Sequence, residues 1–209
     1  FNNTIIKTDL DYNFKTKEAE SLISQALVYT PNDKKILKLA AISHICNLNF
    51  RMASWKLSAL DERYQPMAKL CRSMSNDAQA LNKNNLIKIY TSLEQEKLSL
   101  AMSNLSHSLK DKISLEERQT LFTLLLRQLN KYVDKVEIQA NKLKIHGKSP
   151  LSNLSPLMLN DFDTIDISAI GTDDINELVF LAPEKLMINL LTYSKFSHEL
   201  QNTQYEVIK

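Results

Sequence analysis

The scarcity of residues that interrupt helices constrains this chain more than any other feature of its sequence. Only two glycines, Gly147 and Gly171, and five prolines occur among the 209 residues. Glycine adopts the positive φ angles that tight turns need, and proline ends or kinks helices. So few of these residues disfavour a sheet protein rich in tight turns and a glycine loop that holds phosphate. The sequence therefore predicts a mostly helical fold.

The composition otherwise predicts an ordinary globular protein of the cytoplasm. Apolar residues make up 44% of the chain, which is enough to form a hydrophobic core. Cys46 and Cys71 lie in apolar helical surroundings without metal-ligand spacing, so we expect buried thiols in a reducing compartment. No apolar run reaches the roughly 18 residues of a membrane span, so none is expected. Because the chain begins at Phe1 and not at methionine, we expect a fragment or a processed chain.

Three helices are predicted for residues 15–66, with a turn at residues 29–33 and a shorter one at residues 47–49. The apolar residues of each helix recur at spacings of three and four. Pro31 ends the first helix, and the asparagine and aspartate that follow it can cap the second.

The spacing of small residues within this stretch carries a resemblance to a known family. Ala19 and Ala53 are 34 positions apart, and a branched apolar residue follows each of them four positions later. A 34-residue helix–turn–helix period is that of the tetratricopeptide repeat, which residues 15–66 resemble. The matching residues are Ala19, Ile23, Ala26, Pro31, Ala40, Ala41, Ala53 and Leu57. The stretch departs from the family pattern at His44 and Leu60, where an aromatic and a small residue are usual.

The resemblance implies a binding function. In such proteins antiparallel helix pairs stack and form a concave surface that binds a peptide or a partner protein. Exposed polar side chains of the inner helices and turns would make that contact, so the predicted partner-binding residues are Lys35, Lys38, Asn47, Asn49 and Arg51. The predicted function is that of a protein–protein interaction or scaffold domain.

The rest of the chain is also predicted to be helical. Residues 67–81 and 86–109 have helical apolar spacing. Ser114 and Glu117 match a capping box, in which each side chain satisfies the other's backbone N–H group. This box predicts the start of a long helix, residues 115–145. Further on, a short extended segment is possible at 164–170, a short helix ends at Ala182, and another begins at Pro183.

We therefore predict an all-α fold of antiparallel helix pairs, with one long helix and a C-terminal helical segment. The predicted parts are a linker or N-terminal extension (1–14), a helical domain (15–147), an irregular acidic connector (148–172) and a C-terminal helical segment (173–209). Residues 151–209 carry nine acids and three lysines, a net charge of −6, whereas the 23 bases and 15 acids before them give +8. This asymmetry predicts that the C-terminal segment docks on the body.

A second reading is a regulatory output or dimerisation module of a multidomain signalling protein whose N-terminal domain is absent. Helix 115–145 would then provide a coiled-coil seam for a homodimer. The seam positions are Phe122, Leu125, Leu129, Tyr132, Val136 and Leu143. Leu121, Leu124 and Leu126 widen this stripe beyond a seam, which favours a helix that covers the core.

A third reading assigns phosphotransfer to His107. The residues His107-Ser108-Leu109-Lys110 resemble the H-x-L-K stretch of histidine phosphotransfer domains, where an exposed imidazole beside a lysine accepts a phosphoryl group. The glycine that follows in that family is Asp111 here, and its carboxylate would repel phosphate. A surface histidine near a helix end is the interpretation we favour.

The remaining motifs argue against catalysis, metals and nucleic acid. Asp161, Asp163 and Asp166 are not followed by the glycine and glutamate of a calcium loop. The four histidines share no ligand spacing with the cysteines, and the sequence has no metalloprotease, hydrolase or P-loop motif. Acids interrupt the lysines of residues 131–148 and aromatic residues are not interleaved with them, so nucleic-acid binding is not expected. We predict no enzyme activity, no cofactor and no metal.

Overall fold

The structure, a computed structural model, describes residues 16–76, 80–202 and 205–208. These residues form two compact units, a helical unit (residues 16–113) and a sheet unit (residues 114–208). The linker or extension predicted at residues 1–14 lies outside the described residues.

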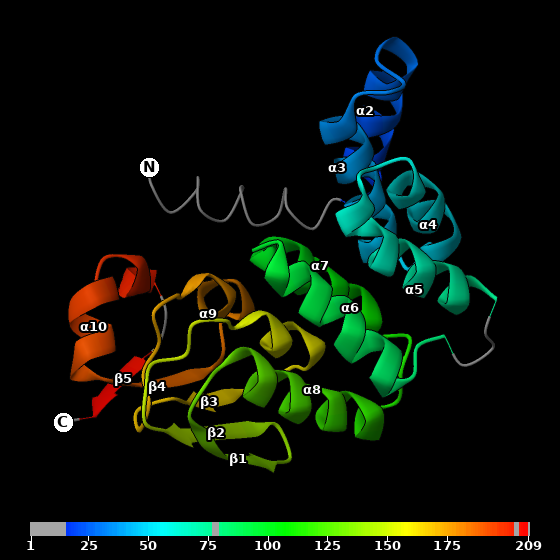
Figure 1. The fold of residues 1–209 in the computed structure, drawn as a ribbon. Coiled ribbons are helices and arrows are strands. Elements are labelled where there is room, and N and C mark those ends of the chain that lie inside the picture. The colour runs from blue at the N-terminus through cyan, green and yellow to red at the C-terminus, as the bar shows by residue number, and fades with distance from the viewer. Residues whose placement is uncertain (1–15, 77–79, 203–204, 209) are drawn as a thin grey trace. The chain divides into compact units, whose positions relative to one another are not determined.

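The described part of the helical unit contains six α-helices and one short 3-10 helix (Figure 1). Their bounds are α2 Thr16–Tyr29, α3 Lys34–Cys46, α4 Phe50–Ser58, η1 Glu62–Tyr64, α5 Gln65–Ser75, α6 Lys83–Gln95 and α7 Ser99–Leu109. Neighbouring helices from α2 to α5 pack against one another, and α3 also packs against α7. Helices and turns between residues 16 and 58 thus lie where the sequence predicts them.

Polar side chains determine where three of these helices begin. Asp33 accepts hydrogen bonds from two backbone N–H groups in the first turn of α3, at 2.8 and 3.0 Å. Asn49 caps α4 at 3.3 Å, and Asn82 caps α6 at 3.0 Å. Each cap satisfies an N–H group for which the helix itself has no acceptor.

The hairpins α3–α4 and α6–α7 share one turn geometry. The second residue after the first helix of each hairpin, Leu48 or Lys97, has a left-handed backbone with a φ of 59° or 57°. The next residue, Asn49 or Leu98, donates its backbone N–H to a carbonyl five residues earlier, at 2.8 or 3.0 Å. The hairpins begin 49 positions apart, at Lys34 and Lys83, and not at the 34-residue period from which a repeat was inferred.

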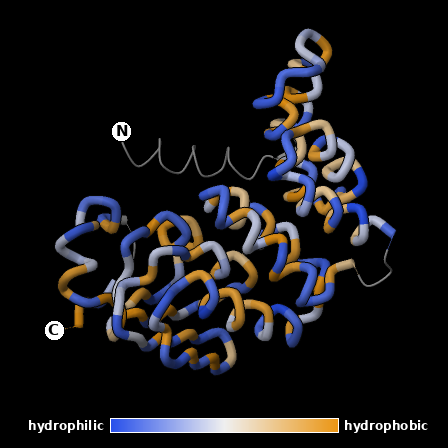
Figure 2. Tube along the Cα trace, viewed as in Figure 1, coloured by the Kyte–Doolittle hydropathy of each residue, from blue (hydrophilic) through white to orange (hydrophobic). Residues whose placement is uncertain are grey.

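Small residues let the helices of this unit approach closely. Ala40, Ala41 and Ala53 are at most 2% exposed, so three positions of the proposed repeat lie in the core. Tyr90 is fully buried, and its hydroxyl lies 2.6 Å from Ser106 Oγ. Hydrophobic and hydrophilic residues alternate along these helices in Figure 2, as expected for helices with one buried face. Such burial is a property of many helical hairpins and does not single out one family.

The sheet unit begins with one helix and continues into a five-stranded sheet (Figure 1). The bounds are α8 Leu115–Leu129, β1 Val133–Gln139, β2 Lys142–Gly147, η2 Ser155–Leu159, β3 Thr164–Asp166, α9 Asn176–Leu181, β4 Lys185–Asn189, α10 Leu190–Phe196, η3 Glu199–Asn202 and β5 Tyr205–Ile208. The strands follow one another in chain order across the sheet, with β1 antiparallel to β2 and the others parallel.

The four parallel strands recur at short intervals along the chain. Leu143 pairs with Ile165 and Ile165 with Leu186, at intervals of 22 and 21 residues. Leu186 pairs with Tyr205, 19 residues later. Each connection contains a short helical segment and is shorter than a βαβ unit of roughly 30 residues.

The two faces of the sheet differ in chemistry. On the core side, the paired Leu143, Ile165 and Leu186 are at most 1% exposed. The next residues along β2 and β3, Lys144 and Asp166, point to the opposite face and form an ion pair at 3.2 Å. Because successive strand residues alternate between faces, the sheet buries apolar side chains on one side and presents charges on the other.

Asn130 joins the end of α8 to the segment that precedes η2. It is 1% exposed, and its side-chain oxygen accepts hydrogen bonds from the backbone N–H groups of Ser152 and Asn153 at 2.8 and 2.9 Å. Its side-chain nitrogen donates to the backbone carbonyls of Leu126 and Asn153 at 3.0 and 2.8 Å. The amide therefore makes all four hydrogen bonds that it can make, and these bonds end α8 at this point.

The prediction of an all-α fold is wrong, because the described residues from Val133 onward form a sheet. The capping box of Ser114 and Glu117 is confirmed, but the helix that it opens ends at Leu129 and not at residue 145. Apolar residues in β1 and β2 alternate with charged ones, and this period of two was read as part of a helical pattern.

The predicted C-terminal helical segment is also wrong in part. The short helix before Ala182 is confirmed as α9, but the helix predicted from Pro183 is replaced by strand β4 and the short helix α10. Leu186 and Ile188 face the core while Met187 does not, which is strand alternation. The helix predicted at 86–109 is two helices, α6 and α7, separated by a turn.

The Asn130→Ala substitution is expected to lower the free energy of unfolding of the sheet unit by about 2–4 kcal/mol. The change removes the acceptor of the backbone N–H groups of Ser152 and Asn153, and losing a hydrogen bond of this kind at a buried group costs roughly 1–3 kcal/mol. Urea unfolding followed by circular dichroism measures the loss. The matched control Asn176→Ala removes an exposed amide from the same unit and should change little, so equal losses would contradict this role of Asn130.

Candidate functional site

The five predicted partner-binding residues lie at both ends of α3. Lys35 and Lys38 occupy its first two turns, whereas Asn47, Asn49 and Arg51 lie in or just after the turn that follows it. A helix of 13 residues is about 20 Å long, so these residues do not form one patch.

Lys38 takes part in a bonding network within the helical unit. Its Nζ lies 2.6 Å from Glu96 Oε2, and the hydroxyl of Tyr64 donates to the same oxygen at 3.1 Å. The hydrogen bond that Lys38 donates to Glu96 lowers the pKa of Glu96 and raises the pKa of Lys38. Glu96 belongs to the α6–α7 turn, so the network ties this turn to α3 and to η1.

Two more of the predicted residues have structural roles. Asn47 donates from Nδ2 to Glu20 Oε2 at 3.2 Å, which joins the end of α3 to α2. Asn49 accepts the N-cap hydrogen bond of α4 through its side-chain oxygen. Lys35 and Arg51 are exposed, and neither forms an ion pair with the described residues. Of the predicted cations, these two are available to a ligand.

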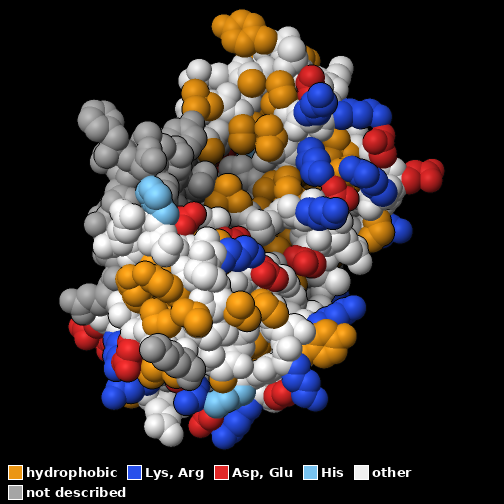
Figure 3. Space-filling view, turned by 90° about the vertical axis from the view of Figure 1, so that its left-hand side faces the viewer, with side chains coloured by type: hydrophobic (Ala, Val, Ile, Leu, Met, Phe, Trp, Pro, Cys, Tyr) orange, Lys and Arg blue, Asp and Glu red, His pale blue; other side chains and the backbone are white. Residues whose placement is uncertain are grey.

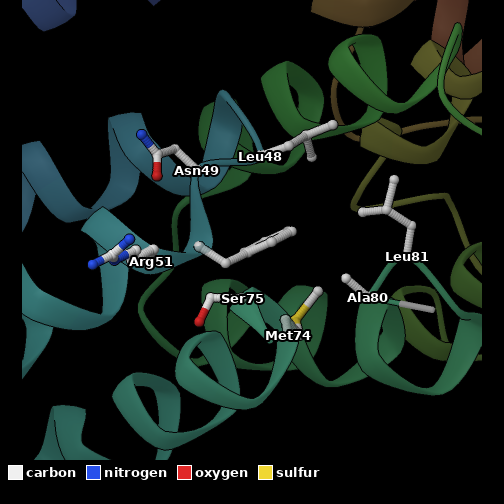
Figure 4. A pocket seen from close by; sticks show the side chains of 8 residues that line it. Leu48, Asn49, Arg51, Met74, Ser75, Ala80 and Leu81 are labelled. Atoms are coloured by element: carbon white, nitrogen blue, oxygen red, sulfur yellow. The ribbon is translucent and has the colours of Figure 1, made fainter. Parts of the chain in front are cut away.

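Asn49 and Arg51 border a pocket that we name the turn pocket (Figure 4). It has a volume of about 300 Å³ and is lined by Leu48, Asn49, Phe50, Arg51, Met74, Ser75, Ala80 and Leu81. The α3–α4 turn and the start of α4 form one wall, and the end of α5 with the residues just before α6 forms the other. In Figure 4, Leu48 and Leu81 lie on one side of the view and Arg51 lies on the opposite side.

The turn pocket is apolar at one end and cationic at the other. Phe50 and Met74 are 5% and 1% exposed and form its buried floor, and Leu48 and Leu81 add partly exposed aliphatic surface. None of the described residues that line it is acidic, and Arg51 forms no ion pair with the part of the chain that the structure describes. An apolar side chain with a carboxylate close to it complements such a pocket.

The charged side chains on the open face of the sheet pair with one another within the sheet unit. Besides Lys144 with Asp166, Glu137 pairs with His146 at 3.0 Å and Lys185 with Glu206 at 2.6 Å. Basic and acidic side chains also lie next to one another on the surface that Figure 3 shows. Charges that are neutralised by neighbours attract a partner weakly, so this face is a less suitable electrostatic site than the turn pocket.

Asp166 illustrates how these charges are held. Burial works to raise its pKa, but hydrogen bonds from Ser168 and Lys144 keep the pKa below its usual value. The Ser168 hydroxyl donates to Asp166 Oδ1 at 2.6 Å, and the Ser168 backbone N–H donates to the same oxygen at 3.0 Å. Asp166 is therefore ionised at neutral pH, and its carboxylate already accepts hydrogen bonds from its neighbours Ser168 and Lys144.

The cysteines and His107 do not form a reactive centre in this structure. Burial raises the pKa of the Cys46 and Cys71 thiols to about 12, so both are protonated at neutral pH and poorly nucleophilic. His107 is exposed in the last turn of α7, and Asp111 follows soon after the helix. Within the described residues no group of three or more His, Cys, Asp or Glu side chains could hold a metal ion. No helix in the described part of the chain has the length and apolarity needed to cross a membrane.

Similarity to known proteins gives no independent support for any of these sites. The comparisons find no family model, no curated protein and no solved structure that matches this chain. The resemblance of residues 15–66 to a tetratricopeptide repeat therefore stays a prediction, and the candidate site rests on its geometry.

Most residues of the turn pocket were missed by the sequence analysis. Met74 and Leu81 are far from Arg51 along the chain, and no local pattern indicates that they lie against the α3–α4 turn. Leu48 gives the one local signal, because an apolar residue stands between two asparagines where a turn usually has polar residues or glycine. This signal points to the pocket but not to its opposite wall.

The Glu96→Gln substitution is expected to weaken the helical unit at neutral pH and to reduce its sensitivity to acid. The folded-state pKa of Glu96 is lowered, so its contribution to stability is present above the unfolded pKa of about 4.3 and is lost as the pH falls through the folded value. We expect a loss of about 1–2 kcal/mol in the free energy of unfolding at pH 7 and a much smaller loss at low pH.

Urea unfolding of both proteins at neutral and at acid pH measures this difference. Asp61→Asn is the control, because it removes an exposed ion pair with Lys34 and should change stability less. An equal loss from Glu96→Gln at both pH values would contradict the role of the ionised carboxylate.

Proposed function

We propose that the helical unit is a protein-interaction module that binds a segment of a partner protein in the turn pocket. The partner would insert one apolar side chain between Leu48 and Leu81 and place a carboxylate beside Arg51. The observation that supports this proposal is the combination, in one pocket, of a buried apolar floor and an exposed arginine that forms no ion pair with the described residues.

The size of the turn pocket agrees with a peptide side chain rather than a large cofactor. Its volume of about 300 Å³ lies at the lower end of the range of about 300–1,000 Å³ for small-molecule sites. Arginine suits the task because its planar guanidinium binds a carboxylate through two parallel hydrogen bonds. Two buried thiols that carry no disulfide agree with a reducing compartment such as the cytoplasm.

The competing readings have less support. A homodimer through a helix of residues 115–145 loses its basis, because Val136 and Leu143 lie on strands β1 and β2. Phosphotransfer by His107 would have to act beside Asp111, whose carboxylate opposes the approach of phosphate. No observation favours a regulatory output role over a general binding role.

Selection of peptides from a random library on the purified protein tests the proposal. Selected peptides are expected to share an apolar residue next to an acidic residue or next to a free C-terminal carboxylate. Arg51→Glu should weaken the binding of these peptides at least tenfold, which corresponds to about 1.4 kcal/mol. The matched control Lys35→Glu makes the same charge change near the other end of α3 and should leave the affinity within about twofold.

A second variant separates the apolar contact from the charge. Leu48 has a φ of 59°, which glycine adopts without strain, so Leu48→Gly should keep the turn while it removes one wall of the pocket. We expect an unchanged circular dichroism spectrum and a clear loss of affinity for the selected peptides, measured by fluorescence anisotropy. Full affinity in both Arg51→Glu and Leu48→Gly would contradict the proposed site.

A further inference from the structure

A second depression in the helical unit lies between α5 and α6, and we name it the α5–α6 groove. It has a volume of about 530 Å³ and is lined by Pro66, Lys69, Leu70, Ser73, Lys88, Thr91, Ser92 and Gln95. The lining residues of each helix recur at spacings of three and four, so one face of α5 and one face of α6 form its two walls. It shares no lining residue with the turn pocket.

The charged residues that line the α5–α6 groove are all basic. Lys69 and Lys88 are exposed, one on each wall, and neither forms an ion pair with the described residues. None of the groove's described lining residues is acidic. Helix α5 also carries Arg72 and no acid, and Glu94 is the single acid on α6. These cations therefore repel one another across the groove unless an anion lies between them.

Two hydroxyl groups of the groove can accept further hydrogen bonds. Ser73 Oγ donates to the backbone carbonyl of Leu70 at 2.8 Å, and Ser92 Oγ donates to that of Lys88 at 3.0 Å. Each hydroxyl donates its one hydrogen to its own helix, so its oxygen can still accept a hydrogen bond from a group in the groove. Acceptors of this kind suit backbone N–H groups, which a peptide has and an inorganic anion lacks.

From these contacts we propose that the α5–α6 groove binds an acidic peptide segment of a partner protein in an extended conformation. Carboxylates of the segment pair with Lys69 and Lys88, and its backbone N–H groups donate to the serine hydroxyls. Lysine binds an anion as a point charge and does not need the bidentate geometry of an arginine fork, so single carboxylates suit this groove. This site gives the helical unit a specificity for acidic peptide segments, and it does not depend on the turn pocket.

The length of the groove sets the length of the segment. Its lining spans seven residue steps on each helix, from Pro66 to Ser73 and from Lys88 to Gln95, which is about 10 Å. An extended peptide covers this distance with about three or four residues. Acidic residues at alternate positions would be about 7 Å apart on the same side of the peptide and could reach both walls.

Fluorescence anisotropy with a short labelled peptide of alternating glutamate and alanine tests the inference. We expect binding that weakens with rising salt, and no binding of the peptide in which glutamine replaces glutamate. The double substitution Lys69→Gln and Lys88→Gln should weaken binding at least tenfold. The control double substitution Lys35→Gln and Lys112→Gln removes the same charge from exposed positions outside the groove and should change the affinity less than twofold.

Arg51→Gln separates this inference from the function proposed for the turn pocket. It should leave the affinity for the glutamate peptide unchanged, whether or not the turn pocket binds a ligand of its own. Equal losses of affinity in the two double variants would mean that the peptide responds only to the net charge of the protein, and they would overturn the inference. It would also be overturned by loss of binding in Arg51→Gln, by binding of the glutamine peptide, or by the absence of any binding at low salt.

Discussion

The chain reversal at Leu48 is the constraint on which the proposed site depends. A left-handed backbone at a residue with a side chain costs about 1–2 kcal/mol, and the chain places no glycine there. The hydrogen bond from the backbone N–H of Asn49 to the carbonyl of His44, at 2.8 Å, and the cap that Asn49 provides to α4 offset this cost. Because the reversal is tight, Leu48 and Arg51 reach the same pocket as the end of α5. The α6–α7 hairpin has the same left-handed backbone at Lys97, so this turn geometry occurs in two hairpins of the helical unit and not in one alone.

The open face of the sheet and the two depressions of the helical unit differ in how their charges are paired. The open face of the sheet neutralises its charges across neighbouring strands, as Lys144 with Asp166 and Lys185 with Glu206 show. The turn pocket and the α5–α6 groove have exposed cations that form no ion pair with the described residues, namely Arg51, Lys69 and Lys88. Paired surface charges contribute little to binding, whereas unpaired cations beside apolar surface give both attraction and specificity. This contrast is the physical reason for placing the binding function in the helices.

The sequence was sufficient where local chemistry decides structure and insufficient where distant contacts decide it. The cap Asp33 and the capping box at Ser114 correctly marked the starts of helices. The small residue Ala53 correctly marked a position of close packing. The sheet was missed because two glycines suggested few tight turns, while the β1–β2 turn uses Ala140 at a φ of 51°. Its sequence signal was the recurrence of apolar pairs two residues apart, within β2 and β4 and at Ile165 and Ile167 in and just after β3, at intervals of 22 and 21 residues. Of the residues that line the turn pocket, Asn49 and Arg51 are among those that the sequence predicted for binding, whereas Met74 and Leu81 are not, because only the packing of α4 on α5 brings them there.

Nuclear magnetic resonance of methyl groups during titration with N-acetyl-leucine tests the central claim most directly. This molecule has the apolar side chain and the carboxylate of the proposed ligand, and its small size limits the affinity to the millimolar range. The account predicts shifts confined to the methyl groups of Leu48, Met74, Ala80 and Leu81, and much weaker shifts with N-acetyl-leucine amide, which lacks the charge that Arg51 would bind. Equal shifts with the acid and the amide, or shifts at methyl groups remote from the turn pocket alone, would contradict it.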